Sequence, residues 1–148
     1  MGMTTYAKNC KSTVIPGLRY RDAMTMIDWL CGAFGFEKHA IYNRADNTVM
    51  HAELRFGNGM IMIGSVDNQS ALCANRMQPD ELGGKETQAP YLIVSDCDAV
   101  YKTAKAAGAK ILMDLEEKDY GGKGFSCSDP EGHTWHLGSY DPWEAQAK

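Results

Sequence analysis

The sequence predicts an α+β fold built from two βαβββ modules in one chain. With 148 residues and 16.3 kDa, the chain has the size of one globular domain with a single sizeable core. Its 44% hydrophobic and 23% charged residues are typical of folded proteins and exclude disordered and fibrous classes. An internal repeat is the third observation: Pro16 and Pro90 are offset by 74 positions, and so are Gly64 and Gly138.

The first module is expected over residues 13–65 as a strand, a helix and three strands. After an extended run, Asp22 stands at an N-cap position before apolar residues at helical spacing, and Gly35 is the expected C-cap. The last two strands meet at Gly57-Asn58-Gly59, where Asn-Gly is a strong hairpin signal. The expected strands are 14–20, 37–42, 49–56 and 60–65.

The second module repeats this plan over residues 90–143. Asp96 or Asp98 caps its helix, which Gly108 closes, and Asp129-Pro130-Glu131-Gly132 is expected to turn the last hairpin. His133 follows this turn and is expected to be exposed to solvent. The expected strands are 91–94, 110–115, 124–128 and 134–139.

Residues 66–89 connect the two modules and are polar and rich in turn formers. A loop of this length within a compact domain is usually functional or mobile. It is either a simple linker or a lid over a site, and the sequence leaves both open.

Alternation along the strands predicts which face of each sheet is buried. Since one module is too small to cover both faces of its own sheet, the two modules are expected to share a core. The opposite faces carry mixed residues and are expected to line a cavity. The positions expected to face the helices are apolar: Leu18, Tyr20, Leu54, Phe56, Ile61, Ile63, Leu92, Val94, Trp135 and Leu137.

Charge and cysteine content exclude several classes of function. Fifteen basic and nineteen acidic residues give a net charge of -4, so nucleic acid is not an expected partner. No stretch reaches the roughly 20 apolar residues of a membrane helix, and residues 1–11 lack a secretory pattern, so a cytoplasmic protein with no membrane partner is expected. The five cysteines never form C-x-x-C, which argues against a disulfide framework or a zinc knuckle.

Three motifs within this architecture carry a family resemblance. They are L-R-Y-R-D-A at 18–23, F-G-F at 34–36 and D-P-E-G-H-T-W at 129–135. Together with the tandem modules, they resemble the vicinal oxygen chelate superfamily, which includes glyoxalase I, the bleomycin-resistance proteins and the extradiol dioxygenases. The resemblance implies a half-barrel cavity and a homodimer whose modules pair side by side or by swapping. Trp29 and residues 140–143 are candidate dimer contacts.

The same resemblance locates the family's metal ligands on the first and last strand of each module. The matching positions are Ile15, Met62, Ala89 and His136. Isoleucine and alanine side chains have no lone pair, and a thioether suits Cu(I) better than zinc, nickel or iron. We therefore expect no metal and no other cofactor. His136 is expected to form a hydrogen-bonded pocket wall, with a lone ligand or a general base as the alternative.

One group of ionisable residues is the candidate site. His51, Glu53 and Arg55 alternate along a strand and therefore share one face. The 74-residue offset places Phe125, Cys127 and Asp129 at the matching positions, so the fold does not require this group. A solvated sheet face is the alternative.

The remaining candidate ligand-binding residues surround this group. Arg19 is expected to point into the cavity, where it needs an anionic partner, either Glu53 or a ligand carboxylate. In glyoxalase-like proteins an arginine near this position helps to bind a carboxylate of the ligand. The resemblance implies the same role for Arg19. The full candidate set is Arg19, His51, Glu53, Arg55, Met60, Met62, Tyr91, Phe125 and His136.

These observations favour metal-independent binding of a small amphipathic or aromatic, anionic molecule in a cavity between the modules, as in bleomycin-resistance proteins. The alternative is a glyoxalase-type lyase or isomerase. It would take its metal from His51, Glu53 and His136, or use Glu53 or His51 as a general base. A module that only dimerises or regulates is a third hypothesis.

Overall fold

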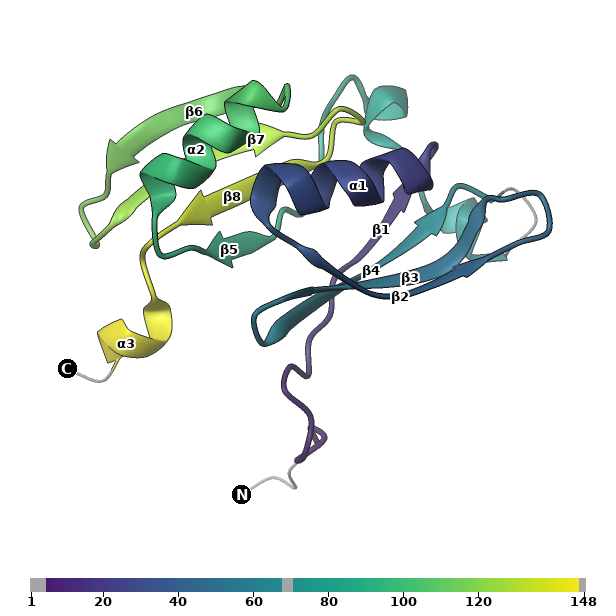
Figure 1. The fold of residues 1–148 in the computed structure, drawn as a ribbon, viewed down its shortest axis with the longest axis horizontal. Helices are drawn as coiled ribbons and strands as arrows, with labels where there is room; N and C mark the ends of the chain where they lie inside the picture. Colours follow the sequence, from purple (N-terminus) through teal and green to yellow (C-terminus); the bar gives the residue numbers. More distant parts are fainter. Residues whose placement is uncertain (1–4, 68–70, 147–148) are drawn as a thin grey trace. The chain divides into compact units, whose positions relative to one another are not determined.

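A computed structural model describes residues 5–67 and 71–146, so residues 1–4, 68–70 and 147–148 lie outside the description. The chain divides into two compact units, and each contains one four-stranded sheet. The first unit comprises residues 1–31 and 35–67, and the second comprises residues 32–34 and 68–148. Each module runs from strand to helix to three strands, so the predicted tandem βαβββ fold is confirmed (Figure 1).

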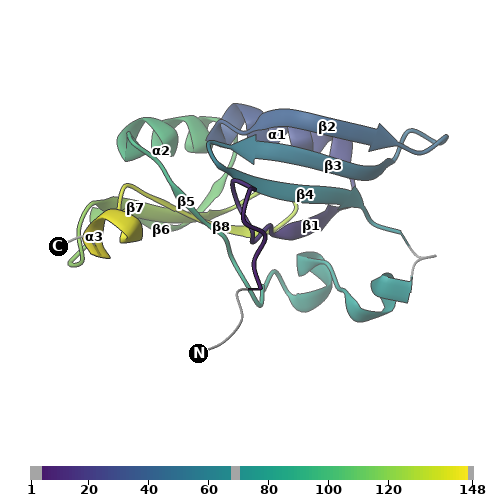
Figure 2. The ribbon, with the colours of Figure 1, turned by 90° about the horizontal axis from the view of Figure 1, so that it is seen from below.

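The first sheet, called sheet A, has the strand order β1-β4-β3-β2 and is not closed into a barrel (Figure 2). Strands β1 and β4 are parallel, and the other pairs are antiparallel. Its elements are β1 (Gly17–Tyr20), α1 (Ala23–Phe34), β2 (Glu37–Asn43), β3 (Val49–Phe56) and β4 (Gly59–Ser65).

The ends of α1 form as the sequence predicts. The Asp22 side chain accepts a hydrogen bond from the backbone N–H of Thr25, and Gly35 ends the helix in the left-handed conformation with φ 94°. The hairpin between β3 and β4 also forms, but its two central residues are Gly57 and Asn58. Gly57 has φ 59°, which is the conformation that the first position of a type II′ turn requires.

The second sheet, called sheet B, repeats this topology with the order β5-β8-β7-β6. Asp96 caps α2, so of the two predicted caps Asp96 is the one used. Helix α2 lies along β6 and β7 (Figure 1). The elements are β5 (Tyr91–Ile93), α2 (Cys97–Ala106), β6 (Lys110–Glu117), β7 (Lys123–Ser128), β8 (Thr134–Gly138) and a short α3 (Pro142–Gln146).

The described part of the connecting segment has structure of its own. It forms two short 3-10 helices, η1 (Ala71–Asn75) and η2 (Pro79–Leu82). Pro79 is fully buried, and a Cβ at Gly132 would lie 3.0 Å from the Cβ of Pro79. Glu86 Oε1 lies 3.1 Å from His133 Nδ1. These contacts attach the segment to the turn before β8.

His133 is therefore not the exposed residue that the sequence predicts. It is only 8% exposed, and its backbone N–H donates to Asp129 Oδ1. Asp129 also accepts from the N–H of Glu131 and from Trp135 Nε1. The turn prediction itself is confirmed, since the N–H of Gly132 donates to the carbonyl of Asp129.

The buried face of each sheet follows the predicted alternation. Of the ten positions expected to face the helices, all are buried except Phe56, which is half-buried. Within residues 5–67 and 71–146, no helix is long and apolar enough to cross a membrane.

The five cysteines differ strongly in their surroundings. Burial, and secondarily the Asp129 carboxylate, raises the pKa of the Cys127 thiol to about 12, whereas Cys10 is exposed. At pH 8 we expect iodoacetamide to alkylate Cys10 first and Cys127 at least ~100-fold more slowly, because the thiolate is the reactive form. Mass spectrometry of timed digests measures both rates. Equal rates would contradict this picture of the core.

The same thiol gives the stability a pH dependence. The folded state retains the Cys127 proton above the thiol's ordinary pKa of 9.0, whereas the unfolded state releases it. Folding should therefore weaken as the pH rises from 9 towards 12. In C127A, urea unfolding over this range should show a smaller loss than in the wild type.

Candidate functional site

The candidate site lies on the face of sheet A opposite to its buried core. From His51 to Arg55 in β3 and from Met60 to Ser65 in β4, half-buried residues alternate with buried ones. The half-buried residues point to what we call the open face of sheet A. It carries Arg19 from β1, Met60 and Met62 from β4, and His51, Glu53 and Arg55 from β3.

Register brings these residues into cross-strand rows. Met62 lies between Gly17 and Glu53, and Met60 pairs with Arg55. Gly64 pairs with Arg19 on β1, and it follows Ile63, the partner of Ala52 on β3. A Cβ at Gly64 would meet no atom closer than a backbone oxygen at 3.4 Å, so the surface above it is open. The six predicted residues of the first module therefore share one face.

A histidine and a glutamate form the polar centre of this face. His51 Nε2 lies 2.9 Å from Glu53 Oε2, and the two side chains are 36% and 24% exposed. The ring of Tyr42 stacks on that of His51 with centroids 6.1 Å apart. His39 Nε2 lies 3.9 Å from the other oxygen of Glu53.

The prediction missed Tyr42 and His39. Tyr42 is the cross-strand partner of His51, which the sequence could have suggested only if the register of β2 against β3 were known. His39 lies at a register shift between Lys38 and Ala40, and no sequence signal marks this bulge.

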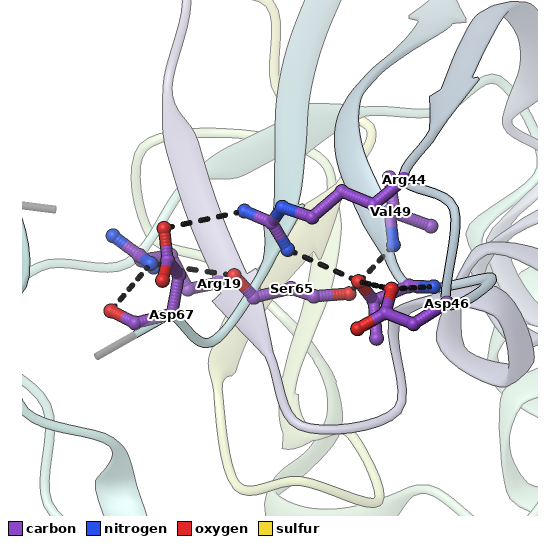
Figure 3. Close-up of polar contacts among 7 residues, drawn as sticks. Arg19, Arg44, Asp46, Val49, Ser65 and Asp67 are labelled. Carbon is purple, nitrogen blue, oxygen red and sulfur yellow. Dashed lines mark hydrogen bonds and ion pairs between the residues drawn. The ribbon is translucent and has the colours of Figure 1, made fainter. Parts of the chain in front are cut away.

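Arg19 reaches backbone carbonyls at the end of β4. Its Nη2 donates to the carbonyl of Ser65 at 3.3 Å and to that of Asp67 at 3.4 Å (Figure 3). Arg44 donates to the Asp67 carboxylate at 3.4 Å (Figure 3). It also donates to the hydroxyl of Thr48. These contacts fix the chain where β4 leaves the sheet. Glu53, proposed as an internal partner of Arg19, pairs instead with His51.

Arg55 has an acidic neighbour on the next strand. Its Nη2 lies 3.2 Å from Glu37 Oε2, and both side chains are largely exposed. Such exposed pairs contribute little to stability. Within the described residues, the Nε of Arg55 is a buried donor without a partner.

Two further predicted residues lie together on sheet B. Tyr91 and His136 are cross-strand neighbours. The hydroxyl of Tyr91 donates to the carbonyl of Tyr140, and its ring passes over Gly138. His136 Nδ1 is hydrogen-bonded to Ser126 Oγ.

The structure contradicts the prediction that Phe125 lines the cavity. Phe125 is only 2% exposed, and its ring contacts that of Tyr101 in α2 edge-on, with centroids 5.1 Å apart. Four residues separate Arg55 from its partner Met60, whereas five separate Ser128 from its partner Thr134. This extra residue shifts β7 by one position and turns Phe125 to the buried face.

This register shows which residues of the second module are structurally equivalent to the candidate residues of the first module. Met62 corresponds to His136, since their N–H groups donate to Pro16 and Pro90. Glu53 then corresponds to Ser126, the partner of His136, and His51 corresponds to Gly124. The second module thus folds without ionisable residues at these two positions, and the conclusion that the fold does not require them is retained.

The family's metal positions do not fit a divalent ion. Ile15 and Ala89 have no donor atom in their side chains, and Met62 offers only a thioether. His136 has one ring nitrogen occupied by Ser126. Within residues 5–67 and 71–146, no group of three or more His, Cys, Asp or Glu is arranged to hold a metal.

A separate pocket of about 580 Å³ lies in the second unit, at the start of α2. Two lysines line it: Lys123 pairs with Asp98 at 3.2 Å, and Lys118 pairs with Glu116 at 2.9 Å. Both cationic groups of this pocket are thus already paired with carboxylates, which gives no indication of an anionic ligand.

The fold and these motifs define the class of protein. Residues 13–137 match the model of the Glyoxalase/Bleomycin resistance protein/Dioxygenase superfamily, and the chain belongs to this superfamily. The resemblance stated from the sequence is thereby confirmed.

Particular relatives are similar over most of the chain. An uncharacterised protein of Mycobacterium tuberculosis (strain H37Rv) is 32% identical over 135 residues, which cover 90% of this chain and 78% of the relative. TioX from Micromonospora sp. ML1 is 30% identical with a TM-score of 0.68, covering 86% of this chain and 97% of TioX.

The fosfomycin resistance protein FosX of Listeria monocytogenes, described as a complex with Mn(II) and sulfate, has a TM-score of 0.64. It is 13% identical, covers 92% of this chain and 95% of FosX, and shows likeness of fold alone.

Proposed function

We propose that the protein binds a small amphipathic molecule, aromatic and anionic, on the open face of sheet A without a metal ion. One observation carries the proposal: the thioethers of Met60 and Met62 lie in the same half-buried surface as Arg19, His51 and Glu53. Apolar walls with a few polar groups are typical of small-molecule sites. Methionine adapts its shape to flat or branched ligands.

The charges of this face favour an anion. Two arginines and one glutamate extend from β1 and β3, so cationic groups outnumber carboxylates on these strands. Guanidinium groups bind carboxylates with two parallel hydrogen bonds. The stacked rings of Tyr42 and His51 offer a further flat surface to an aromatic group.

The superfamily context supports this class of activity. Its name includes bleomycin resistance proteins, and FosX is described as a fosfomycin resistance protein. By analogy, we propose that the protein sequesters a small toxic compound of the amphipathic, aromatic and anionic kind described above. A homodimer stays a prediction; Trp143, a candidate contact, is 84% exposed.

The test uses 2-naphthoate as an anionic aromatic probe and 2-naphthylmethylammonium as its cationic counterpart. In ¹H–¹⁵N spectra, naphthoate should shift the amides of β3 and β4, and the cation should bind more weakly. M62A should weaken naphthoate binding about 10–100-fold, because a methionine side chain that a ligand covers fully contributes about 1.5–3 kcal/mol, and alanine adds no charge to the face. M24A, at an exposed methionine of α1, is the matched control.

Metal independence is measured on the same sample. After dialysis, the protein should retain far less than one equivalent of zinc, nickel, manganese or iron, and EDTA should leave naphthoate binding unchanged. Stoichiometric metal, or binding that EDTA abolishes, would overturn the proposal.

A further inference from the structure

We infer that His51 is a general base, positioned by Glu53, that removes an acidic proton from a molecule held on the open face of sheet A. This inference rests on the proposed binding site but adds a chemical activity to it. It gives His51 and Glu53 separate roles, and the reaction it predicts is proton abstraction next to a carbonyl group.

The first argument is the geometry of the pair. A carboxylate oxygen only accepts hydrogen bonds, so the 2.9 Å contact requires the proton of the neutral imidazole to lie on Nε2. The lone pair is then on Nδ1, which has no hydrogen-bond partner among residues 5–67 and 71–146. A carboxylate that fixes the tautomer and orientation of a histidine in this way is the arrangement of a general base.

The surroundings of the ring restrict it further. The ring of Tyr42 stacks on one side at 22° between planes, and β3 holds both members of the pair on the same face. Nε2 of His39 lies 3.9 Å from the second oxygen of Glu53, so a second imidazole is within ion-pair distance of the same carboxylate. An ordinary surface ion pair has neither a stacked ring nor two imidazoles around one carboxylate.

Space for a substrate exists beside the pair. Gly64 of β4 pairs with Arg19, and a Cβ at Gly64 would lie 3.4 Å from the backbone oxygen of Met50, the residue before His51, so no side chain of β4 covers this point of the face. Met62 lies beside Glu53 in the next row. A molecule resting there would have an apolar wall on one side and the base on the other.

The second module shows that the pair is not needed for folding. The equivalent residues are Gly124 and Ser126 in the same topology. A strand of this fold therefore forms without a histidine and a glutamate at these positions, and their presence in β3 needs a different explanation.

The proposed step balances without a cofactor. The C–H bond next to the carbonyl breaks, its proton forms an N–H bond at His51 Nδ1, and the electron pair moves to the carbonyl oxygen to give an enolate. Return of a proton from the imidazolium to carbon restores the starting compound or its isomer. In D₂O the returned atom is deuterium.

The test follows this exchange with phenylpyruvate, an aromatic 2-oxo acid whose methylene protons are acidic. Proton NMR in D₂O should show faster loss of the methylene signal with the wild-type protein than in buffer. H51Q should return the rate to background. E53Q should lower kcat by a factor of about 10²–10⁴ with KM unchanged, and E53D should recover part of the loss.

D28N, which changes an exposed ion pair with Lys38, is the control for folding and should exchange at the wild-type rate. Amide shifts recorded with the same probe separate the two proposals. Binding without accelerated exchange overturns this inference and leaves the proposed function standing, whereas absence of both overturns both. Acceleration that survives in H51Q also overturns the inference.

Discussion

Replacing Asp129 with alanine is expected to lower the free energy of unfolding by about 3–5 kcal/mol. Asp129 is 4% exposed and accepts hydrogen bonds from two backbone N–H groups and from Trp135 Nε1. Alanine removes the acceptor of the N–H of His133 and of Trp135 Nε1, which are both buried, and of the partly buried N–H of Glu131. Urea unfolding followed by circular dichroism measures the loss.

Two variants make this experiment specific. D129N keeps one oxygen acceptor but turns an N–H₂ group towards one set of donors, so its loss should be intermediate. D46A removes a comparable turn carboxylate that binds Thr48 on the exposed β2–β3 turn, and it should cost much less. Equal losses in D46A and D129A would show that burial of Asp129 is not the cause.

Gly138 gives the second large effect. In G138A, the new Cβ would lie 2.7 Å from the hydroxyl oxygen of Tyr91 and 2.9 Å from the backbone oxygen of Lys123. The tyrosine can move, but the backbone of β7 cannot move without disturbing its ladder. We expect a loss of about 2–3 kcal/mol, as for other overpacked cores.

The internal repeat supplies the matched control. Gly64 occupies the corresponding position in sheet A, where the added Cβ would meet only a backbone oxygen at 3.4 Å. G64A should leave the free energy of unfolding nearly unchanged. Alanine lowers the conformational entropy of the unfolded chain, which stabilises the folded state by about 0.4–1 kcal/mol and offsets the mild crowding. Thermal unfolding of both variants compares them directly. A larger loss in G64A than in G138A would contradict the structure.

Most of the fold could be predicted because its local signals agree with its tertiary structure. Asp22 and Gly35 cap α1 as their residue types suggest, and residues 49–56 form a strand with the predicted bounds. The first strand is shorter than predicted and begins at Gly17. Pro16, the residue before it, has no N–H to donate to the ladder.

The site was only partly predictable, because spacing along one strand shows which residues share a face but does not show which residues of neighbouring strands they contact. Alternation alone places His51 and Glu53 on one face, and the structure agrees. Contacts between strands depend on register, which the sequence does not specify, and so the partners of Arg19 and the stacking of Tyr42 were not found. His133 was assigned to solvent because its partner Glu86 lies 47 residues away.

The single additional residue in the β7–β8 hairpin has a consequence for how duplicated halves diverge. Side chains in a strand point alternately up and down, so one insertion in a loop exchanges every inward and outward position of the strand before it. A copied segment could in this way convert polar positions into core positions without any substitution within the strand. Alignments of such proteins should therefore follow the hydrogen-bonded ladder, because at β7 the constant offset of 74 compares residues from opposite sides of the sheet, whereas at β8 it compares true equivalents.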